Sequence, residues 1–316
     1  MSLRVILIFL SKLYRKVFKF LKLQMKKLLF FLFISTQVFS QNIKFEGKLV
    51  DVKTQEPVVY ANISFLKSDK GISSNEDGTF LMNLDKKYLE SKVHISCLNY
   101  KDTIVLAKDL YQKTLFLNPI SEVLNEIVLT KKIDKTVTLD EVKKKVEAIH
   151  TSGMRMIAKY FPNSKKNSCC NYISTIEIHF SKKHSKQSKF RFRIFDKDEK
   201  TGNPKNDLLK INIPLTLKPG DLKLTVNLED YNIEMPENGV FIAFEKLFIP
   251  FNEYGKNEQD ENSEVLYSPV IGFTKYPKKK ENDLYFYVEG KWQKWALTEV
   301  KHYSKYAPAI SLKLTN

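Results

Sequence analysis

Histidine is the side chain best suited to acid–base catalysis near neutral pH, and this chain of 316 residues contains five. His179, His184 and His302 lie in its C-terminal half, where a hydrolase would place one beside a carboxylate and a nucleophilic Ser or Cys. No GxSxG or HExxH sequence accompanies them. We therefore interpret each as a surface or strand-facing histidine, assign no catalytic residue, and expect no enzymatic activity.

Two acidic stretches have the oxygen-rich composition of calcium sites. They are Asn75, Glu76 and Asp77 in the first stretch, and Asp196, Asp198, Asn203 and Asp207 in the second. The first lacks the 12-residue alternation and distal Glu of an EF-hand, and the second lies in one long polar loop. A turn with solvated carboxylates is the favoured interpretation of both, so we assign no metal and no other cofactor.

The three cysteines do not have the spacing of a zinc site, because no CxxC pair or histidine cluster accompanies them. Cys97 lies in the apolar, strand-like run VHISCLNY and is predicted to be a small core residue. Cys169 and Cys170 are adjacent, and a bridge between neighbours strains the peptide bond. A link from either of them to Cys97 stays open, but structural or free thiols are the favoured interpretation.

Aromatic residues near the C-terminus could stack against sugar rings. They are Tyr254, Tyr267, Tyr276, Tyr285, Tyr287, Trp292 and Trp295. Aromatic residues that alternate along strands more often fill a core or form cross-strand pairs, which is the favoured interpretation here. Carbohydrate binding remains an alternative that depends on these rings.

The elements that position these side chains begin after a leader. From Met25 the chain reads MKKLLFFLFISTQVFSQ, a basic start, an apolar run and a small residue at Ser40, which is the layout of a signal peptide. We expect a leader over residues 1–40 and export to the periplasm, outer membrane or cell surface. Residues 1–24 are also basic and apolar, with apolar positions at helical spacing. Translation from Met25 is the favoured interpretation, and a membrane-surface helix or an uncleaved anchor stays open.

The formal net charge is +16, from 52 Lys and Arg against 36 Asp and Glu, a value that raises the question of nucleic-acid binding. Eight of the basic residues and none of the acidic ones lie in residues 1–40. Residues 131–189 hold 14 basic and 5 acidic residues, spread along the segment without a nucleic-acid motif. We therefore expect no nucleic-acid partner, and a basic surface that faces anionic lipid or another polyanion.

Residues 41–130 alternate short strands with turns, which predicts a small antiparallel β-sandwich. The segments Gly47–Asp51, Glu56–Val58, Tyr60–Ile63, Gly71 and Asn75–Phe80 resemble the carboxypeptidase regulatory-like domain, and Leu124–Leu129 resembles the strand that closes this module. The resemblance implies a seven-stranded, transthyretin-like sandwich without peptidase chemistry, common in secreted and envelope proteins of bacteria. In this sandwich we expect Gly47 to leave room where strands cross and Gly78 to supply a positive φ.

Residues 131–167 are predicted to form a basic helical connector. Thr138 and Glu141 fit a capping box, and Leu139, Val142, Val146 and Ile149 then share one helix face. A second helical piece is expected over residues 154–161. Residues 168–316 again show strand spacing, with Phe190, Phe192 and Ile194 on one side, and predict a second sandwich, jelly-roll-like.

These patterns predict an all-β chain of two sandwich domains, at residues 41–130 and 168–316. The absence of a catalytic constellation favours a non-catalytic envelope protein that binds or scaffolds at the outer membrane. Its partner would be an envelope protein or outer-membrane component, with a glycan or anionic lipid as further candidates. The alternative is a hydrolase or a carbohydrate-binding protein whose site lies in the C-terminal sandwich.

Overall fold

The computed structural model describes residues 14–26, 42–120, 134–143, 146–148, 155–181, 186–255, 265–275, 284–288, 290–294 and 306–316. It divides the chain into two compact units, one of residues 1–43 with 83–87 and one of residues 44–82 with 88–316. Several predictions lie outside the described residues: the apolar run of the leader, the closing strand at 124–129, Tyr276, Trp295, His184 and His302.

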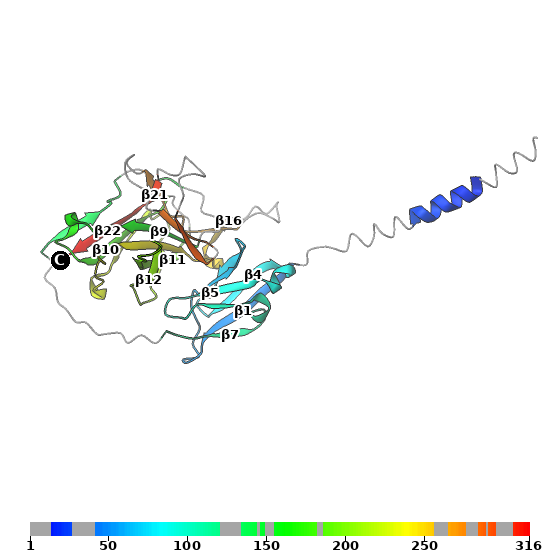
Figure 1. Ribbon diagram of the computed structural model, residues 1–316, viewed down its shortest axis with the longest axis horizontal. Coiled ribbons are helices and arrows are strands. Elements are labelled where there is room, and N and C mark those ends of the chain that lie inside the picture. The colour runs from blue at the N-terminus through cyan, green and yellow to red at the C-terminus, as the bar shows by residue number, and fades with distance from the viewer. Residues whose placement is uncertain are drawn as a thin grey trace, which may run out of the picture. The chain divides into compact units, whose positions relative to one another are not determined.

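The first unit contains a helix over residues 14–26, drawn in blue in Figure 1. The rings of Tyr14 and Phe18, one turn apart, stack with their centroids 6.0 Å from each other. Among the described residues, the structure has no helix that combines the length and the apolarity needed to cross a membrane.

Two small sheets pack face to face within residues 42–117, most of which belong to the second unit. The first has the order β4-β1-β7, formed by Thr79–Asp85, Asn42–Asp51 and Thr114–Leu117, and β1 and β7 are parallel. The second has the order β3-β2-β5-β6, formed by Gly71–Ser73, Asn62–Phe65, Lys92–Ser96 and Thr103–Leu106. Short 3₁₀ turns η1 (Lys86–Glu90) and η2 (Ala107–Asp109) connect them. The ring of Phe45 on β1 lies 5.4 Å from that of Phe65 on β2, so the sheets enclose a common core.

Seven strands is the number that the family resemblance implies, although membership of that family stays a prediction. The positive φ predicted for Gly78 is confirmed. Gly47 leaves room as predicted, but for the loop before β7 and not for a crossing strand. A Cβ on Gly47 would lie 2.6 Å from the carbonyl oxygen of Leu110, which is too close for any side chain. Gly78 has a φ of +76°, a conformation that L-residues with a Cβ adopt at a cost.

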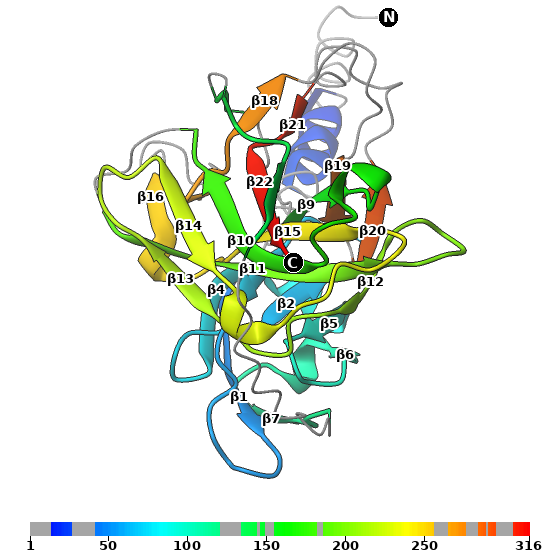
Figure 2. The ribbon, with the colours of Figure 1, turned by 90° about the vertical axis from the view of Figure 1, so that its left-hand side faces the viewer.

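Two larger sheets follow, and most of their strands are labelled in Figure 2. One has the order β14-β10-β22-β8, from Lys223–Asn227, Tyr172–His179, Ile310–Thr315 and Thr136–Leu139. The other, the seven-stranded sheet, has the order β12-β11-β15-β9-β19-β20, from Pro204–Asp207, Ser188–Lys197, Val240–Lys246, Met156–Phe161, Leu284–Val288 and Lys291–Lys294, with β13 (Pro214–Leu217) also beside β11.

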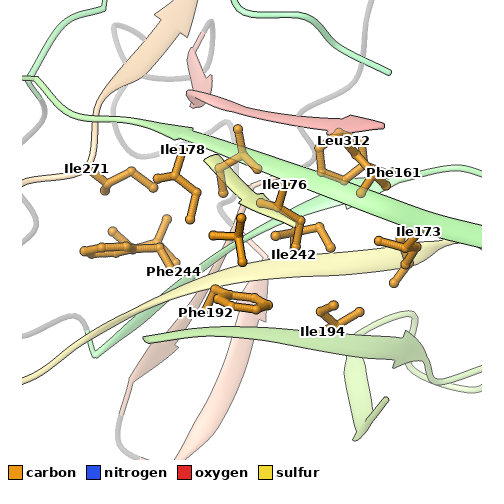
Figure 3. Packing of buried hydrophobic residues seen from close by; sticks show 14 of the residues in the cluster. Phe161, Ile173, Ile176, Ile178, Phe192, Ile194, Ile242, Phe244, Ile271 and Leu312 are labelled. Carbon is orange, nitrogen blue, oxygen red and sulfur yellow. The ribbon is translucent and has the colours of Figure 1, made fainter. Parts of the chain in front are cut away.

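The core lies between these two sheets. Ile176 and Ile178 of β10 point toward Phe192 of β11 and Phe244 of β15, and all four side chains are buried (Figure 3). Short elements complete the described chain: the pairs β16 (Glu253–Gly255) with β17 (Leu266–Tyr267) and β18 (Phe273–Lys275) with β21 (Tyr306–Pro308), and the turns η3 (Lys165–Asn167), η4 (Glu229–Tyr231) and η5 (Pro250–Asn252). The prediction of an all-β, sandwich-like fold is confirmed.

The predicted helical connector is wrong over the described residues. Thr136–Leu139 form strand β8, which pairs with β22, and Met156–Phe161 form strand β9 between β15 and β19. Both segments are rich in β-branched or aromatic residues, and pairing with strands far along the chain overrides the local capping signal at Thr138. The segment therefore contributes strands to both C-terminal sheets.

Candidate functional site

The seven-stranded sheet has two apolar faces. On β11, Phe190, Phe192 and Ile194 point into the core described above, as the sequence alternation predicts. Arg193 and Phe195 stand on the opposite face, together with Ala243 of β15 and Ala158 of β9. A strand places successive side chains on opposite faces, so this second face is set by the same period-two pattern.

Six aromatic side chains gather on that second face, and we call them the aromatic face: Tyr160, Phe195, Phe241, Tyr285, Tyr287 and Trp292. Their rings are in direct contact. The centroids of Phe241 and Tyr285 are 4.8 Å apart, and those of Tyr287 and Trp292 are 5.2 Å apart. Each pair has the edge-to-face geometry that the ring quadrupoles favour.

The sheet curves toward the aromatic face. Phe195 is on β11 and Trp292 is on β20, with three strands between them. In a flat sheet, four steps of about 4.8 Å would separate these strands by roughly 19 Å. Their ring centroids are only 5.5 Å apart. The small side chains of Ala158 and Ala243 at the centre of the face leave the space that the rings occupy.

Three of the six aromatic residues of this face reach the protein surface in part. Phe195, Phe241 and Tyr285 are buried, whereas Tyr160, Tyr287 and Trp292 are partly exposed. The hydroxyl of Tyr160 donates to the carbonyl oxygen of Asn238 at 2.6 Å, which fixes that ring. Burial raises the pKa of Tyr287 to about 12, so its phenol is neutral at physiological pH.

Cations border these rings. The ammonium of Lys197 lies 4.7 Å from the centre of the Tyr160 ring, and that of Lys294 lies 5.8 Å from the Tyr285 ring. The guanidinium of Arg193 lies 4.9 Å from the Phe195 ring and forms an ion pair with Asp207. Burial raises the pKa of Asp207, while the charge of Arg193 opposes that effect.

At its other end, the same face meets the first β-sandwich through a buried ionic network. Arg191 on β11 donates from Nε and Nη2 to the two carboxylate oxygens of Glu245, at 2.9 and 2.8 Å. It also donates to the carbonyl oxygen of Tyr60 at 2.8 Å. Both charged side chains are only 2% exposed. The pair therefore bonds the C-terminal sheet to the N-terminal sandwich without contact with water.

Arg155 extends this network. Its guanidinium donates to the side-chain carbonyl of Asn62 and to the backbone carbonyl of Ile63, the latter at 2.9 Å. Asn62 in turn donates to Glu245 at 3.4 Å. Burial lowers the pKa of Arg155 to about 10, and the charge of Glu245 opposes this effect. The guanidinium passes so close to Gly71 that a Cβ there would overlap it.

The carboxylates of the acidic loop all interact with neighbouring protein groups. Asp207 is held by Arg193, and Asp196 accepts from the backbone and side chain of Asn206. Asp198 accepts the backbone N–H of Thr201 at 2.7 Å and pairs with Lys205 at 3.1 Å. Each carboxylate thus stabilises its own turn or strand. No group of three His, Cys, Asp or Glu able to hold a metal occurs within the described ranges.

The first acidic stretch is only in part the solvated turn that the sequence favours. Asp77 accepts from the backbone and hydroxyl of Thr79, as a turn carboxylate does. Glu76 instead accepts from Lys189 of β11 and from the hydroxyl of Tyr60. These hydrogen bonds from Lys189 and Tyr60 lower the pKa of Glu76.

The predicted basic surface over residues 131–189 is partly neutralised by neighbouring carboxylates. Lys143 forms an ion pair with Glu141 at 2.8 Å. Lys159 is buried, donates to the carbonyl oxygen of Ile310 at 2.7 Å and lies 3.4 Å from Asp140. Part of this charge therefore lies inside the protein.

Histidine–carboxylate pairs occur at two places in the described chain. Nε2 of His179 is 2.7 Å from a carboxylate oxygen of Glu177, whose other oxygen accepts from Lys223 at 2.9 Å. His94 lies 3.0 Å from Asp102, and its Nδ1 is buried without a partner. Neither pair shows a Ser or Cys side chain bonded to the imidazole in the described residues, so neither has the arrangement of a nucleophilic triad.

All three cysteines are free thiols in the structure, as favoured from the sequence. Cys97 is buried, which confirms its predicted place in the core. Cys169 is exposed and Cys170 is buried, and their sulfur atoms are 2.7 Å apart. Burial raises the pKa of Cys170 to about 11.

Of the aromatic residues that the sequence offered as an alternative sugar platform, the structure brings Tyr285, Tyr287 and Trp292 together. Tyr254 and Tyr267 belong to the separate hairpin β16–β17. The sequence prediction missed Tyr160, Phe195 and Phe241. The signal that could have identified them is their position on the strand face opposite the core residues, where solvated side chains would be expected.

Comparisons with known proteins leave the family open, because no family model and no curated protein matches the chain. One solved structure, the cysteine protease and lectin-like domains of Cwp84, a surface layer associated protein of Clostridium difficile, aligns at 9% identity with a TM-score of 0.37. The alignment covers 87% of this chain and 63% of that one, less than two thirds of its length. A likeness at this level carries no argument about fold or function.

Proposed function

We propose that the chain is a non-catalytic binding protein of the bacterial cell envelope whose ligand is a glycan held on the aromatic face. The observation that carries this proposal is the group of three partly exposed rings, Tyr160, Tyr287 and Trp292, on one curved sheet. A sugar ring has an apolar C–H face and a hydroxyl edge. Flat aromatic rings cover the C–H face, and polar groups at the border of the rings bind the hydroxyl edge.

The arrangement is preorganised for such a ligand. Trp292 packs against both Phe195 and Tyr287, and Tyr160 packs against Phe241 at 5.0 Å while its hydroxyl is held by Asn238. Rings fixed in this way lose little conformational entropy when a ligand stacks on them. Lys197 and Lys294 at the border supply N–H donors for hydroxyl or acidic groups of a glycan.

The cellular setting of the proposal comes from the sequence. The leader that begins at Met25 indicates export, and the resemblance of residues 43–130 to a carboxypeptidase regulatory-like domain is typical of envelope proteins. In this proposal, the N-terminal sandwich is a scaffold, joined through Arg191 and Glu245 to the sheet that binds the ligand.

Binding is tested by titrating the full chain with a panel of purified bacterial envelope polysaccharides in isothermal calorimetry. We expect saturable binding to at least one of them. Trp292→Ala should weaken binding roughly thirtyfold, the effect of about 2 kcal/mol that is typical of a central aromatic contact. Tyr231→Ala, which removes an exposed aromatic ring elsewhere, should leave the affinity within about twofold of the wild type.

Two further results distinguish ring stacking from hydroxyl-mediated binding and from hydrolysis. Tyr160→Phe keeps the ring but loses the hydrogen bond to Asn238, so it should weaken binding far less than Tyr160→Ser, which removes the ring. Equal affinities of the Trp292→Ala and Tyr231→Ala variants would contradict the proposal. The length of the polysaccharide should stay unchanged after prolonged incubation, and shortened products that disappear in His179→Ala would favour the hydrolase alternative instead.

A further inference from the structure

The helix over residues 14–26 has all of its apolar side chains exposed in the structure. Tyr14, Val17, Phe18, Leu21 and Met25 are between 49% and 70% exposed. Apolar side chains on a helix of a folded protein usually cover a core. No other residue of the helix covers these side chains, so they are available to pack against an apolar surface.

The two kinds of side chain lie on separate faces of the helix. With about 100° between successive residues, the five apolar residues Tyr14, Val17, Phe18, Leu21 and Met25 fall within an arc of roughly 100°. The basic residues fall on the opposite arc: Arg15, Lys16, Lys19, Lys22 and Lys26. Residues 14–26 contain no Asp or Glu. Leu23 is an apolar residue on the basic side, and Phe20 lies between the two faces.

We infer that this helix lies on an anionic lipid bilayer, with Val17, Leu21 and Met25 toward the acyl chains and the lysines at the phosphate level. A narrow apolar face bordered by cations, with no acidic residue, is complementary to such a surface. The same five cations make a protein groove a less suitable partner for the helix. A groove of ordinary composition would have to bury these cations or pair each with a carboxylate. The inference goes beyond glycan binding and depends on a different part of the chain. It takes the alternative that the sequence leaves open, in which residues 14–26 are translated and retained, in place of a start at Met25.

The test is co-flotation of the full chain with vesicles of phosphatidylcholine that contain phosphatidylglycerol, compared with pure phosphatidylcholine. We expect binding to the anionic vesicles to be at least tenfold stronger, and to weaken about fivefold for each lysine changed in Lys19→Gln and Lys22→Gln. High salt should abolish the difference between the two kinds of vesicle.

Leu21 and Leu23 provide a matched pair of variants. Both are exposed leucines of one helix, 55% and 54% exposed, and both variants retain the rest of the leader unchanged. Leu21→Gln should weaken binding to anionic vesicles about tenfold, whereas Leu23→Gln, on the basic side, should stay within about twofold of the wild type. Glutamine keeps the helix propensity close to that of leucine.

Three results would overturn the inference. The first is equal loss of binding in the Leu21→Gln and Leu23→Gln variants. The second is self-association of the chain that Leu21→Gln abolishes while vesicle binding persists, because the face would then contact a second copy. The third is an intact mass, measured on protein isolated from its native envelope, which shows that the chain begins at residue 25 or later.

Discussion

The buried pair of Arg191 and Glu245 predicts a large loss of stability in Glu245→Ala. The carboxylate accepts two hydrogen bonds from Arg191, and both side chains are 2% exposed. Its removal leaves Arg191 and Arg155 as buried cations in the network without a carboxylate. Breaking a buried pair in this way costs about 3–5 kcal/mol. That is a large fraction of a typical folding free energy of about 5–15 kcal/mol.

Urea unfolding of the full chain measures this effect. With a slope near 3 kcal/mol per molar urea, the midpoint should fall by about 1–2 M. Glu90→Ala removes the exposed partner of Lys108 and should shift the midpoint by less than about 0.3 M, because surface pairs contribute at most about 1 kcal/mol.

A double variant separates the ionic contribution from packing. Arg191→Met with Glu245→Leu removes both charges of the pair, so it should be more stable than Glu245→Ala alone. A midpoint for Glu245→Ala that equals that of Glu90→Ala would refute the reasoning, because it would mean that water reaches Arg191 in the folded protein.

Three further predictions concern separate parts of the fold. Gly71→Ala should lower stability by about 1–3 kcal/mol in thermal unfolding, because its Cβ would overlap the guanidinium of Arg155. Although burial opposes it, hydrogen bonding by Lys223 and His179 lowers the pKa of Glu177 below its ordinary 4.5. The wild type should therefore be more stable than Glu177→Gln at neutral pH, and should lose that advantage as pH falls below about 4.5. Alkylation near pH 8 should modify Cys169 alone in the folded chain, since burial raises the pKa of the other two thiols.

Each of these three predictions has a control or a result that would contradict it. Gly255→Ala places its Cβ at ordinary contact distance, 3.4 Å from Leu266, and should be nearly neutral. A stability difference between wild type and Glu177→Gln that does not change with pH would contradict the ionic origin of the effect. For the thiols, mass spectrometry should count one adduct in the folded chain and three after unfolding. A folded chain with no adduct would mean that Cys169 and Cys170 are bridged.

The sequence predicted well what depends on neighbouring residues. The alternation of Phe190, Phe192 and Ile194 is visible within one strand, and its core face is the one in the structure. Gly78 was assigned correctly because a turn imposes local geometry on the backbone. The close approach at Gly47 was also expected, although the backbone beside it is a loop and not a crossing strand.

The connector was mispredicted because its partners are distant in the chain. The capping pattern at Thr138 is a local helix signal, whereas strand β8 is stabilised by pairing of Val137 with Leu314 on β22. No pattern within residues 131–167 reveals that partner. Tertiary pairing of this kind overrides helix propensity, which contributes only tenths of a kcal/mol per residue.

Only half of the aromatic face could be predicted, because the other half also depends on residues that are distant in the chain. Tyr285, Tyr287 and Trp292 are close in sequence and were considered together. Phe195 joins them only because the sheet curves until β11 and β20 approach, and curvature is a property of the whole sheet. The burial of Arg191 and Glu245 depends in the same way on distant residues, because the N-terminal sandwich covers both side chains.

The central claim, that a glycan stacks on the aromatic face, is tested most directly by the fluorescence of Trp292. The chain has two tryptophans, so Trp295→Phe leaves Trp292 as the single reporter. Addition of the polysaccharide identified by calorimetry should shift its emission in a saturable manner and protect it from acrylamide, with the same Kd as the calorimetric titration. Unchanged emission and quenching at saturating glycan would contradict the account.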